Sequence, residues 1–249
     1  MGTIMSSYVL NNLTQFLEEW APLEQAARWD NCGMQLGDPD AMVQSVLLTV
    51  DIDNAVLQFL EETPVDLVIS HHPLFFKPIK QIHYKRDLGR ILKLFLSKDI
   101  HLYTMHTNLD VADAGVNDCL AKQYGFLPHQ GVTISDGFGK WFENRSEHTF
   151  ESLVKTLPCQ IMGNKHPEKI NRVAFGAGSG KSLVPQLVDL HVDLFITGEL
   201  THHDFVYCDM HNITVLTLGH GESEVFVLPE VEQRLKTKFK SLDISISGS

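Results

Sequence analysis

Residues 65–73 read VDLVISHHP, an apolar run that ends in two adjacent histidines. The chain repeats this unit, because residues 192–197 read VDLFIT, with Val-Asp-Leu identical. Further along, residues 100–105 resemble residues 213–218 in the same alternation of apolar and polar side chains. In both units, polar side chains of the metal-ligand type follow the predicted strands. This repetition predicts one site in the cleft between the two units.

Short apolar runs alternate with amphipathic segments in both units, which is typical of a mainly parallel sheet covered by helices. We therefore predict an α/β fold of two similar units with helices on the sheet faces. The first unit is predicted over residues 1–125 and the second over residues 126–224, with residues 225–249 packing back on the first. The predicted strands are 45–51, 66–70, 100–105, 171–176, 193–197 and 213–218, and the predicted helices lie near 54–62, 86–98, 114–124, 180–190 and 202–210 and from 222 onwards.

The remaining segments carry weaker signals. A helix that Ser7 caps is expected to end near Trp20, and the Gly- and Asp-rich stretch 28–40 is predicted to be a loop. Residues 126–170 are expected to hold strands and one helix near 149–157. Pro229 predicts a kink or break in the last helix. Apolar and polar residues alternate over 242–246, which predicts an edge strand.

The composition excludes several classes of protein. The chain has 249 residues and a net charge of −11, and this negative charge argues against electrostatic binding to nucleic acid or to anionic lipid. No apolar stretch approaches the length of a membrane span, and residues 1–6 show no secretory signal. The four cysteines form no Cys-x-x-Cys motif, so we expect reduced thiols in a cytoplasmic protein.

Histidines and carboxylates follow the predicted strands, where sites form in open parallel sheets. Because consecutive strand residues point in opposite directions, His71 and His72 can each serve one of two neighbouring ions. His220 and Glu224 are four residues apart at a predicted helix start and share a face. Imidazoles with carboxylates suit a pair of zinc, iron, manganese, cobalt or nickel ions. Taken singly, each histidine is more often a surface or hydrogen-bonded residue, and Glu224 an ordinary first-turn acid.

The motifs in order resemble one family, the GTP cyclohydrolase I type 2 homologues, also called NGG-one-interacting-factor-three-like proteins. The motifs are WDNCG at 29–33, SHHPL at 70–74, HTNLD at 106–110, GVND at 115–118, GAGSG at 176–180, TGE at 197–199 with His202 and His203, and GHGESE at 219–224. This chain departs from the family pattern at Cys32 and at Glu222, which adds a carboxylate able to compete for metal.

The resemblance implies two divalent metal ions per chain, of unknown identity. Its implied ligands are His71, His72, Asp110, His220 and Glu224. It also implies that the two α/β units are intertwined. A further implication is a homo-oligomer, a toroidal hexamer, with a small-molecule substrate such as a nucleotide. A membrane or nucleic-acid partner is not expected. His106 resembles a further pocket or ligand residue.

The resulting hypothesis is a dinuclear metal-dependent hydrolase, in which metal-activated water attacks a nucleotide ring or a related cyclic amide. His106 or His202 would move protons. The alternative is a metal-binding assembly or regulatory protein without turnover, which has the same ligand set. Residues 178–182 (GSGKS) look like the end of a P-loop, but Phe175 stands where the first glycine is required, so an ATPase or GTPase is not expected. These glycines would instead let backbone pass close to the site, or present amides to an anion.

Overall fold

The computed structural model describes residues 7–163 and 166–247 and divides the chain into two units. Unit 1 is Met1–Leu109 with Leu228–Ser249, and unit 2 is Asp110–Val227. Residues 1–6, where no secretory signal was expected, lie outside the described residues. The sequence placed the helix near 114–124 in the first unit. The structure places α5 (Val116–Gln123) in unit 2, because this helix packs on β10 (Arg172–Ser179) and on η5 (Val225–Val227), which both belong to that unit.

Unit 1 is built on a five-stranded sheet in the order β13-β4-β5-β6-β2. Four strands are parallel, and β2 pairs antiparallel with β6 at one edge. The strands are β13 (Asp243–Ile246), β4 (Ser45–Thr49), β5 (Leu67–Ser70), β6 (His101–Thr104) and β2 (Gly33–Leu36), beside a separate pair of β1 (Tyr8–Val9) and β3 (Met42–Val43).

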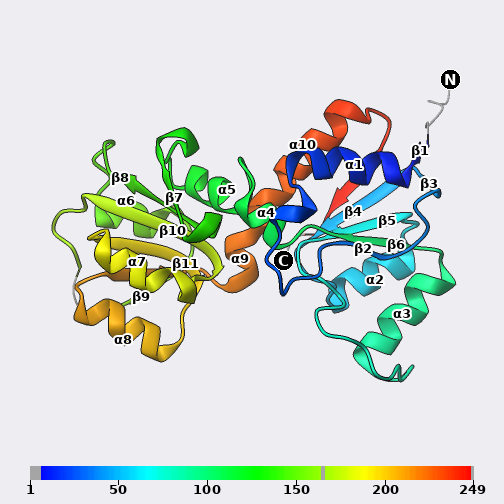
Figure 1. Cartoon of the computed structure of the whole chain (residues 1–249), viewed down its shortest axis with the longest axis horizontal. Coiled ribbons are helices and arrows are strands. Elements are labelled where there is room, and N and C mark those ends of the chain that lie inside the picture. Colours follow the sequence, from blue (N-terminus) through cyan, green and yellow to red (C-terminus); the bar gives the residue numbers. More distant parts are fainter. Residues whose placement is uncertain (1–6, 164–165, 248–249) are drawn as a thin grey trace. The chain divides into compact units, whose positions relative to one another are not determined.

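Helices cover both faces of this sheet. Figure 1 shows α2 and α3 on one face and α1 and α10 on the other. The first face holds a core in which Val56 and Leu60 of α2 and Phe95 of α3 pack on Val68 and Leu102 of the sheet. The helices of unit 1 are α1 (Leu10–Trp20), η1 (Leu23–Gln25), α2 (Asn54–Glu62), α3 (Asp87–Ser97) and α10 (Leu228–Lys238).

Unit 2 has a six-stranded sheet in the order β7-β8-β10-β11-β12-β9. Its three central strands are parallel, and antiparallel strands flank them on both sides. The strands are β7 (Val132–Ile134), β8 (Gly139–Glu143), β10 (Arg172–Ser179), β11 (Leu194–Glu199), β12 (Thr214–Thr217) and β9 (Gln160–Met162).

Alternation along the central strands of unit 2 separates two cores. Leu194 and Ile196 of β11 pack with α5 and α6, whereas Phe195 between them packs with α7 and α8. Since both faces are covered, these strands are apolar throughout, as a parallel sheet requires. The remaining elements are α4 (Thr107–Val111), which crosses from one unit to the next, η2 (Pro128–Gln130), η3 (Ser135–Gly137), α6 (Phe150–Thr156), η4 (Gly180–Leu183), α7 (Val184–Asp189), α8 (His202–Met210), α9 (His220–Glu224) and η5 (Val225–Val227).

The repeated Val-Asp-Leu has the same structural role in both units. Asp66 Oδ2 accepts hydrogen bonds from the backbone N–H groups of Gln44 (2.8 Å) and Ser45 (2.9 Å), just before β4 and at its start. Asp193 Oδ2 accepts from the corresponding groups of Asn171 (2.7 Å) and Arg172 (2.9 Å) at the start of β10. The aspartate therefore satisfies backbone donors of the neighbouring strand, which explains why it recurs with the strand.

Two local expectations change, and two are confirmed. Ser7 does not cap the first helix: α1 begins at Leu10 after Val9, which makes no side-chain cap, because residues 8–9 pair with β3. The predicted loop 28–40 contains the edge strand β2. Pro229 does mark a break, since it lies in the first turn of α10, where proline needs no hydrogen-bond acceptor, and residues 242–246 do form an edge strand.

Candidate functional site

Three histidines of unit 1 lie together at the carboxyl ends of neighbouring parallel strands. His71 and His72 follow β5, and His106 follows β6. Each offers one ring nitrogen, and these three atoms lie within 4.8 Å of one another. We call His71, His72 and His106 the histidine group.

Every member of the histidine group is oriented through its Nδ1 atom. The acceptors are the Met105 carbonyl oxygen for His71 (2.8 Å), Asp51 Oδ1 for His72 (2.9 Å) and Asp30 Oδ1 for His106 (2.8 Å). With Nδ1–H donating to these oxygens, Nε2 is the ring atom through which each histidine would bind a metal ion. This is the arrangement by which proteins fix the tautomer of metal-binding histidines.

Asp30 is the more deeply buried of the two carboxylate acceptors. Its side chain is fully buried and accepts from His106 Nδ1, from the Thr107 backbone N–H (3.1 Å) and hydroxyl, and from Cys32 Sγ (3.0 Å). Burial alone would raise the pKa of Asp30, but the hydrogen bonds from His106, Thr107 and Cys32 outweigh it and hold that pKa well below its ordinary value. Burial, with the Asp30 carboxylate beside it, raises the pKa of the Cys32 thiol to about 11.

Unit 2 carries a second group of potential ligands on the short helix α9. Nε2 of His220 lies 3.3 Å from Oε1 of Glu224, one helical turn away, and the two residues form the His220–Glu224 pair. Glu199, at the end of β11, accepts from His220 Nδ1 at 3.1 Å. A carboxylate at the end of one parallel strand therefore orients a histidine after the next strand, as Asp51 does for His72 in unit 1.

Gly178 allows backbone to approach the His220–Glu224 pair closely. Its φ is +61°, and a Cβ there would lie 2.3 Å from Glu224 Oε1 and 3.2 Å from His220 Nε2. The Gly178 N–H donates to Ser223 Oγ (2.8 Å), whose hydroxyl donates to the His220 carbonyl (2.7 Å). The glycine-rich stretch 176–180 thus has the first of its two predicted roles, close passage of the backbone.

Other residues predicted for the site lie as follows. Asp110 is in α4, where its backbone carbonyl accepts from Asn117 Nδ2 (3.2 Å). His202 is the exposed first residue of α8, with its ring 5.6 Å from that of His203. Glu222 is exposed, and its carboxylate occupies the space that a Cβ on Gly219 would need.

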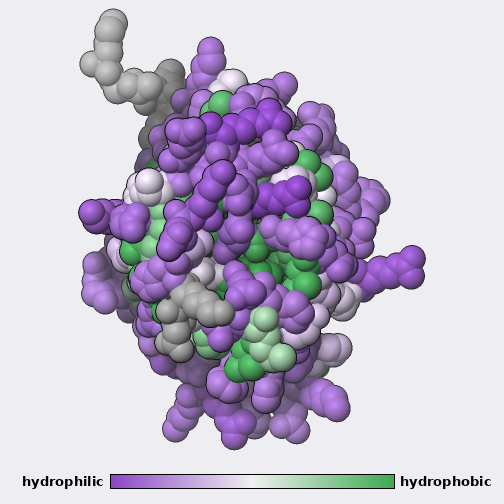
Figure 2. All heavy atoms as spheres, turned by 90° about the vertical axis from the view of Figure 1, so that its left-hand side faces the viewer, coloured by the Kyte–Doolittle hydropathy of each residue, from purple (hydrophilic) through white to green (hydrophobic). Residues whose placement is uncertain are grey.

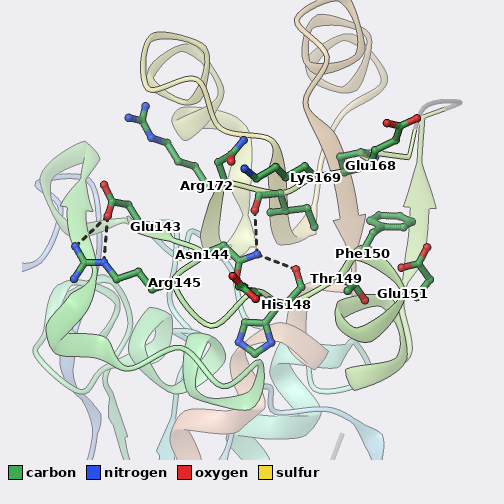
Figure 3. A pocket seen from close by; sticks show the side chains of 14 residues that line it. Glu143, Asn144, Arg145, His148, Thr149, Phe150, Glu151, Glu168, Lys169 and Arg172 are labelled. Atoms are coloured by element: carbon green, nitrogen blue, oxygen red, sulfur yellow. Dashed lines mark hydrogen bonds and ion pairs between the residues drawn. The ribbon is translucent and has the colours of Figure 1, made fainter.

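Two cavities of unit 2 lie at opposite edges of its sheet. One, of about 630 Å³, is lined by Gly219 and Glu222 on either side of His220, by Glu199 and by apolar side chains that include Leu218 and Met162. The other, of about 720 Å³, is shown in Figure 3 and surrounds Asn144, which donates to the carbonyls of His148 (2.8 Å) and Ile170 (3.1 Å). Arg172 and Glu143, which line this cavity, are register partners of β10 and β8 at the start of β10. The cavity therefore lies at the edge of the sheet away from α9.

The surface features are consistent with the acidic composition. Polar side chains cover most of the face shown in Figure 2, with apolar ones in small patches. No helix among residues 7–163 and 166–247 has the length and apolar character needed to cross a bilayer. The described residues include Cys32, Cys119, Cys159 and Cys208, and none of these four forms a disulfide.

Three site residues were not assigned a role from the sequence: Asp30, Asp51 and Glu199. Asp30 and Glu199 belong to recognisable motifs, but Asp30 lies 76 positions from the histidine that it holds. Asp51 and Glu199 each lie 21 positions before theirs. Their signal is a carboxylate at a strand end in a parallel sheet, next to a strand that ends in histidine.

Comparison with known proteins places the chain in a family. The model of Duf34/NIF3 (NGG1p interacting factor 3) matches residues 9–248. NIF3-like protein 1 of Drosophila melanogaster is 34% identical over 84% of this chain and 75% of its own length. A protein named GTP cyclohydrolase 1 type 2 homolog, from Clostridium perfringens, is 30% identical over 93% of each chain. The structure of reduced HcgD from Methanocaldococcus jannaschii superposes with a TM-score of 0.85 at 26% identity, over 97% of this chain and 98% of that one. This chain belongs to the Duf34/NIF3 family.

Proposed function

We propose that this protein is a metal-dependent hydrolase with a two-ion centre. The ions would be held by His71, His72, Asp110, His220 and Glu224, with His106 as a further ligand rather than only a pocket residue. The observation that carries the proposal is the orientation of four histidines. In each, a carboxylate or carbonyl oxygen accepts from Nδ1 and so fixes the orientation of the ring, as is usual for metal-binding histidines.

The residues present fit divalent transition metals. Imidazole nitrogens with carboxylate oxygens suit zinc, iron, manganese, cobalt or nickel, and the set contains no thiolate that would favour a softer ion. Gly178 supports this fit, because any larger residue would displace the Glu224 carboxylate. The proposed ligand set is the one that the family resemblance implies.

Bound divalent ions supply Lewis acidity and make a bound water acidic enough to act as a nucleophile near neutral pH. The chain's own residues orient and exchange protons. Asp30, Asp51 and Glu199 keep the histidine rings oriented, and the exposed His202 would accept a proton. The name of the Clostridium relative supports a nucleotide ring as the substrate, with a related cyclic amide as the wider class. The cavity beside α9 offers room for such a ring.

Metal content per chain tests the centre directly. Untagged protein purified without chelator is expected to contain about two transition-metal ions per chain by elemental mass spectrometry. The double variant His220→Ala, Glu224→Ala is expected to lose at least one of them. His129→Ala removes an exposed histidine of unit 2 that lies outside the proposed ligand set, and should keep both. Protein that stays empty after exposure to zinc, iron and manganese contradicts the proposal.

Turnover separates the hydrolase from its alternative. Metal-loaded protein is incubated with GTP, other nucleotides and cyclic amides, and products are identified by mass spectrometry. Hydrolysis that Asp110→Asn abolishes supports the enzyme. A loaded centre that turns over none of these substrates would favour a metal-binding assembly or regulatory protein.

We also propose a homohexamer, which the family resemblance implies. Light scattering coupled to size-exclusion chromatography is expected to give six times the mass of the 28.1 kDa chain. A monomer in solution would contradict it.

A further inference from the structure

Two large aromatic side chains of unit 1 are exposed beside the histidine group. Trp29 is 61% exposed and Phe76 is 48% exposed. Their ring centroids are 5.7 Å apart at an interplanar angle of 63°. The His106 ring lies 6.1 Å from that of Trp29 and 6.5 Å from that of Phe76, so both aromatics border the histidine whose Nδ1 is held by Asp30.

The two loops that carry these rings are fixed to each other by hydrogen bonds. Asn31 Nδ2 donates to the Phe75 carbonyl (2.7 Å), and the Phe75 N–H donates to Gln35 Oε1 (3.0 Å). Gln35 Nε2 in turn donates to the Asn31 carbonyl (2.7 Å). The backbone beside each ring is therefore held in place although the rings themselves face solvent. A preorganised exposed surface loses little conformational entropy when a ligand covers it.

We propose that Trp29 and Phe76 form a stacking platform for a planar heteroaromatic ring, of the purine-base class, next to His106. This inference rests on the proposed function, because it names the substrate class of the same site. Rings at 63° form a corner, in which a flat ligand stacks on one ring and meets the edge of the other.

The surroundings favour a base over an aliphatic ligand. A single exposed aromatic needs no explanation, but here two are paired and both contact a candidate metal ligand. The platform is bordered by the polar groups of His106 and Asn31 instead of an apolar groove, so it offers a π-face within a polar rim. Base stacking on aromatic side chains uses such a surface.

Tryptophan fluorescence can isolate the platform. The chain has three tryptophans, and arginine guanidinium groups cover the other two: Arg234 lies 4.0 Å from the Trp20 ring centroid and Arg172 lies 5.0 Å from that of Trp141. The double variant Trp20→Phe, Trp141→Phe leaves Trp29 as the sole emitter. Its emission is expected at the long wavelength of an exposed indole, and GTP is expected to quench it. A mixture of ribose 5-phosphate and tripolyphosphate, which lacks the base, should not.

Binding affinities complete the test. In the wild-type background Trp29→Leu is expected to weaken GTP binding roughly 5- to 100-fold, measured by calorimetry, the range that loss of one base-stacking contact gives. Trp29→Phe, which keeps a ring, should lose less. Tyr84→Leu is the matched control, since Tyr84 is an aromatic of unit 1 that is 75% exposed and lies outside the platform. Metal content of the Trp29 variants should equal that of the wild type.

Some results would overturn the platform. One is a Trp29 emission that GTP leaves unchanged, and another is an equal GTP affinity for the wild type and Trp29→Leu. A third is a short-wavelength Trp29 emission that acrylamide does not quench, which would mean that another chain covers the ring. The hydrolase proposal fails separately. If GTP stacks on Trp29 but the protein hydrolyses no substrate, the hydrolase proposal fails and the platform proposal stands. If the protein hydrolyses GTP equally fast with Trp29→Leu at low substrate concentration, the platform proposal fails and the hydrolase proposal stands.

Discussion

Replacing the two aspartates that orient histidines in unit 1 should affect metal affinity unequally. Asp30→Asn and Asp51→Asn make the same chemical change at acceptors of His106 and His72, at 2.8 and 2.9 Å. The difference between them is burial, because the Asp30 side chain is fully buried and that of Asp51 is 61% exposed. Their comparison therefore isolates the effect of environment.

The magnitude follows from what each carboxylate holds. Loss of an outer-shell partner costs about 10- to 100-fold in metal affinity. Asp51 can be replaced in part by water, so we expect a loss of about 10-fold, or 1.4 kcal/mol. Asp30 accepts from His106 on one oxygen and from Thr107 and Cys32 on the other. An asparagine has a single acceptor oxygen and must turn its NH₂ towards one set of donors, so about 100-fold is expected.

The assay is competition for zinc against a chromophoric chelator, with circular dichroism to show that each variant is folded. Equal losses for the two variants, or a larger loss for Asp51→Asn, would refute the role assigned to burial. Metal-free protein gives an independent check by pH. Because the pKa of Asp30 is lowered in the folded state, its ionised form stabilises the fold above about pH 4. This stabilisation is lost as pH falls below that value towards the folded pKa, so the stability difference between wild type and Asp30→Asn should shrink there.

Three further predictions concern single positions. Gly178→Ala should weaken metal binding about tenfold or more, because the added methyl group displaces the Glu224 carboxylate. The control is Gly125→Ala, which is also at positive φ (+79°) but away from the His220–Glu224 pair and should leave metal binding unchanged. Equal effects of the two variants in chelator competition would contradict this prediction. Cys32 has a pKa raised to about 11 from 9.0, so its thiolate fraction at pH 8 should be about 100-fold lower in the folded than in the unfolded chain. Alkylation of Cys32, followed by peptide mass spectrometry, should therefore be about 100-fold slower in the folded protein. Alkylation as fast as in urea would rule the pKa shift out. Asp66→Ala should lower the free energy of unfolding by about 2 kcal/mol in urea titrations, because it removes the acceptor of two backbone donors, and a change under about 0.5 kcal/mol would show that water replaces it.

Strand periodicity and strand-end chemistry predicted much of this protein. The apolar runs around residues 67–70 and 194–199 form strands of two different sheets, each paired in parallel with a neighbouring strand as expected. The histidines after residue 70 lie together with His106 as a group. This part was accessible because parallel strands bring their carboxyl ends to one edge.

Other features depended on contacts distant in the sequence. The edge strand β2 has four residues and starts at Gly33 with φ of +96°, so its sequence resembles a loop and only pairing with β6 makes it a strand. Asp30 acquires its role from His106, 76 positions away, across elements that no local pattern links. Ser7 was predicted as a helix cap from residue type alone, but pairing of β1 with β3 moved the helix start past it.

The course of the chain between units has a consequence for synthesis. Unit 2 is one continuous segment, Asp110–Val227, inserted within unit 1, whose edge strand β13 pairs Asp243 with Ser45 of β4. On the ribosome, unit 2 emerges whole and can fold while the β4 edge of unit 1 still has unpaired backbone groups. The N-terminal part of the protein is thus the last to be completed. Until β13 arrives, β4 is an open edge that another nascent chain can occupy, which makes the closing strand a safeguard against misassembly during translation.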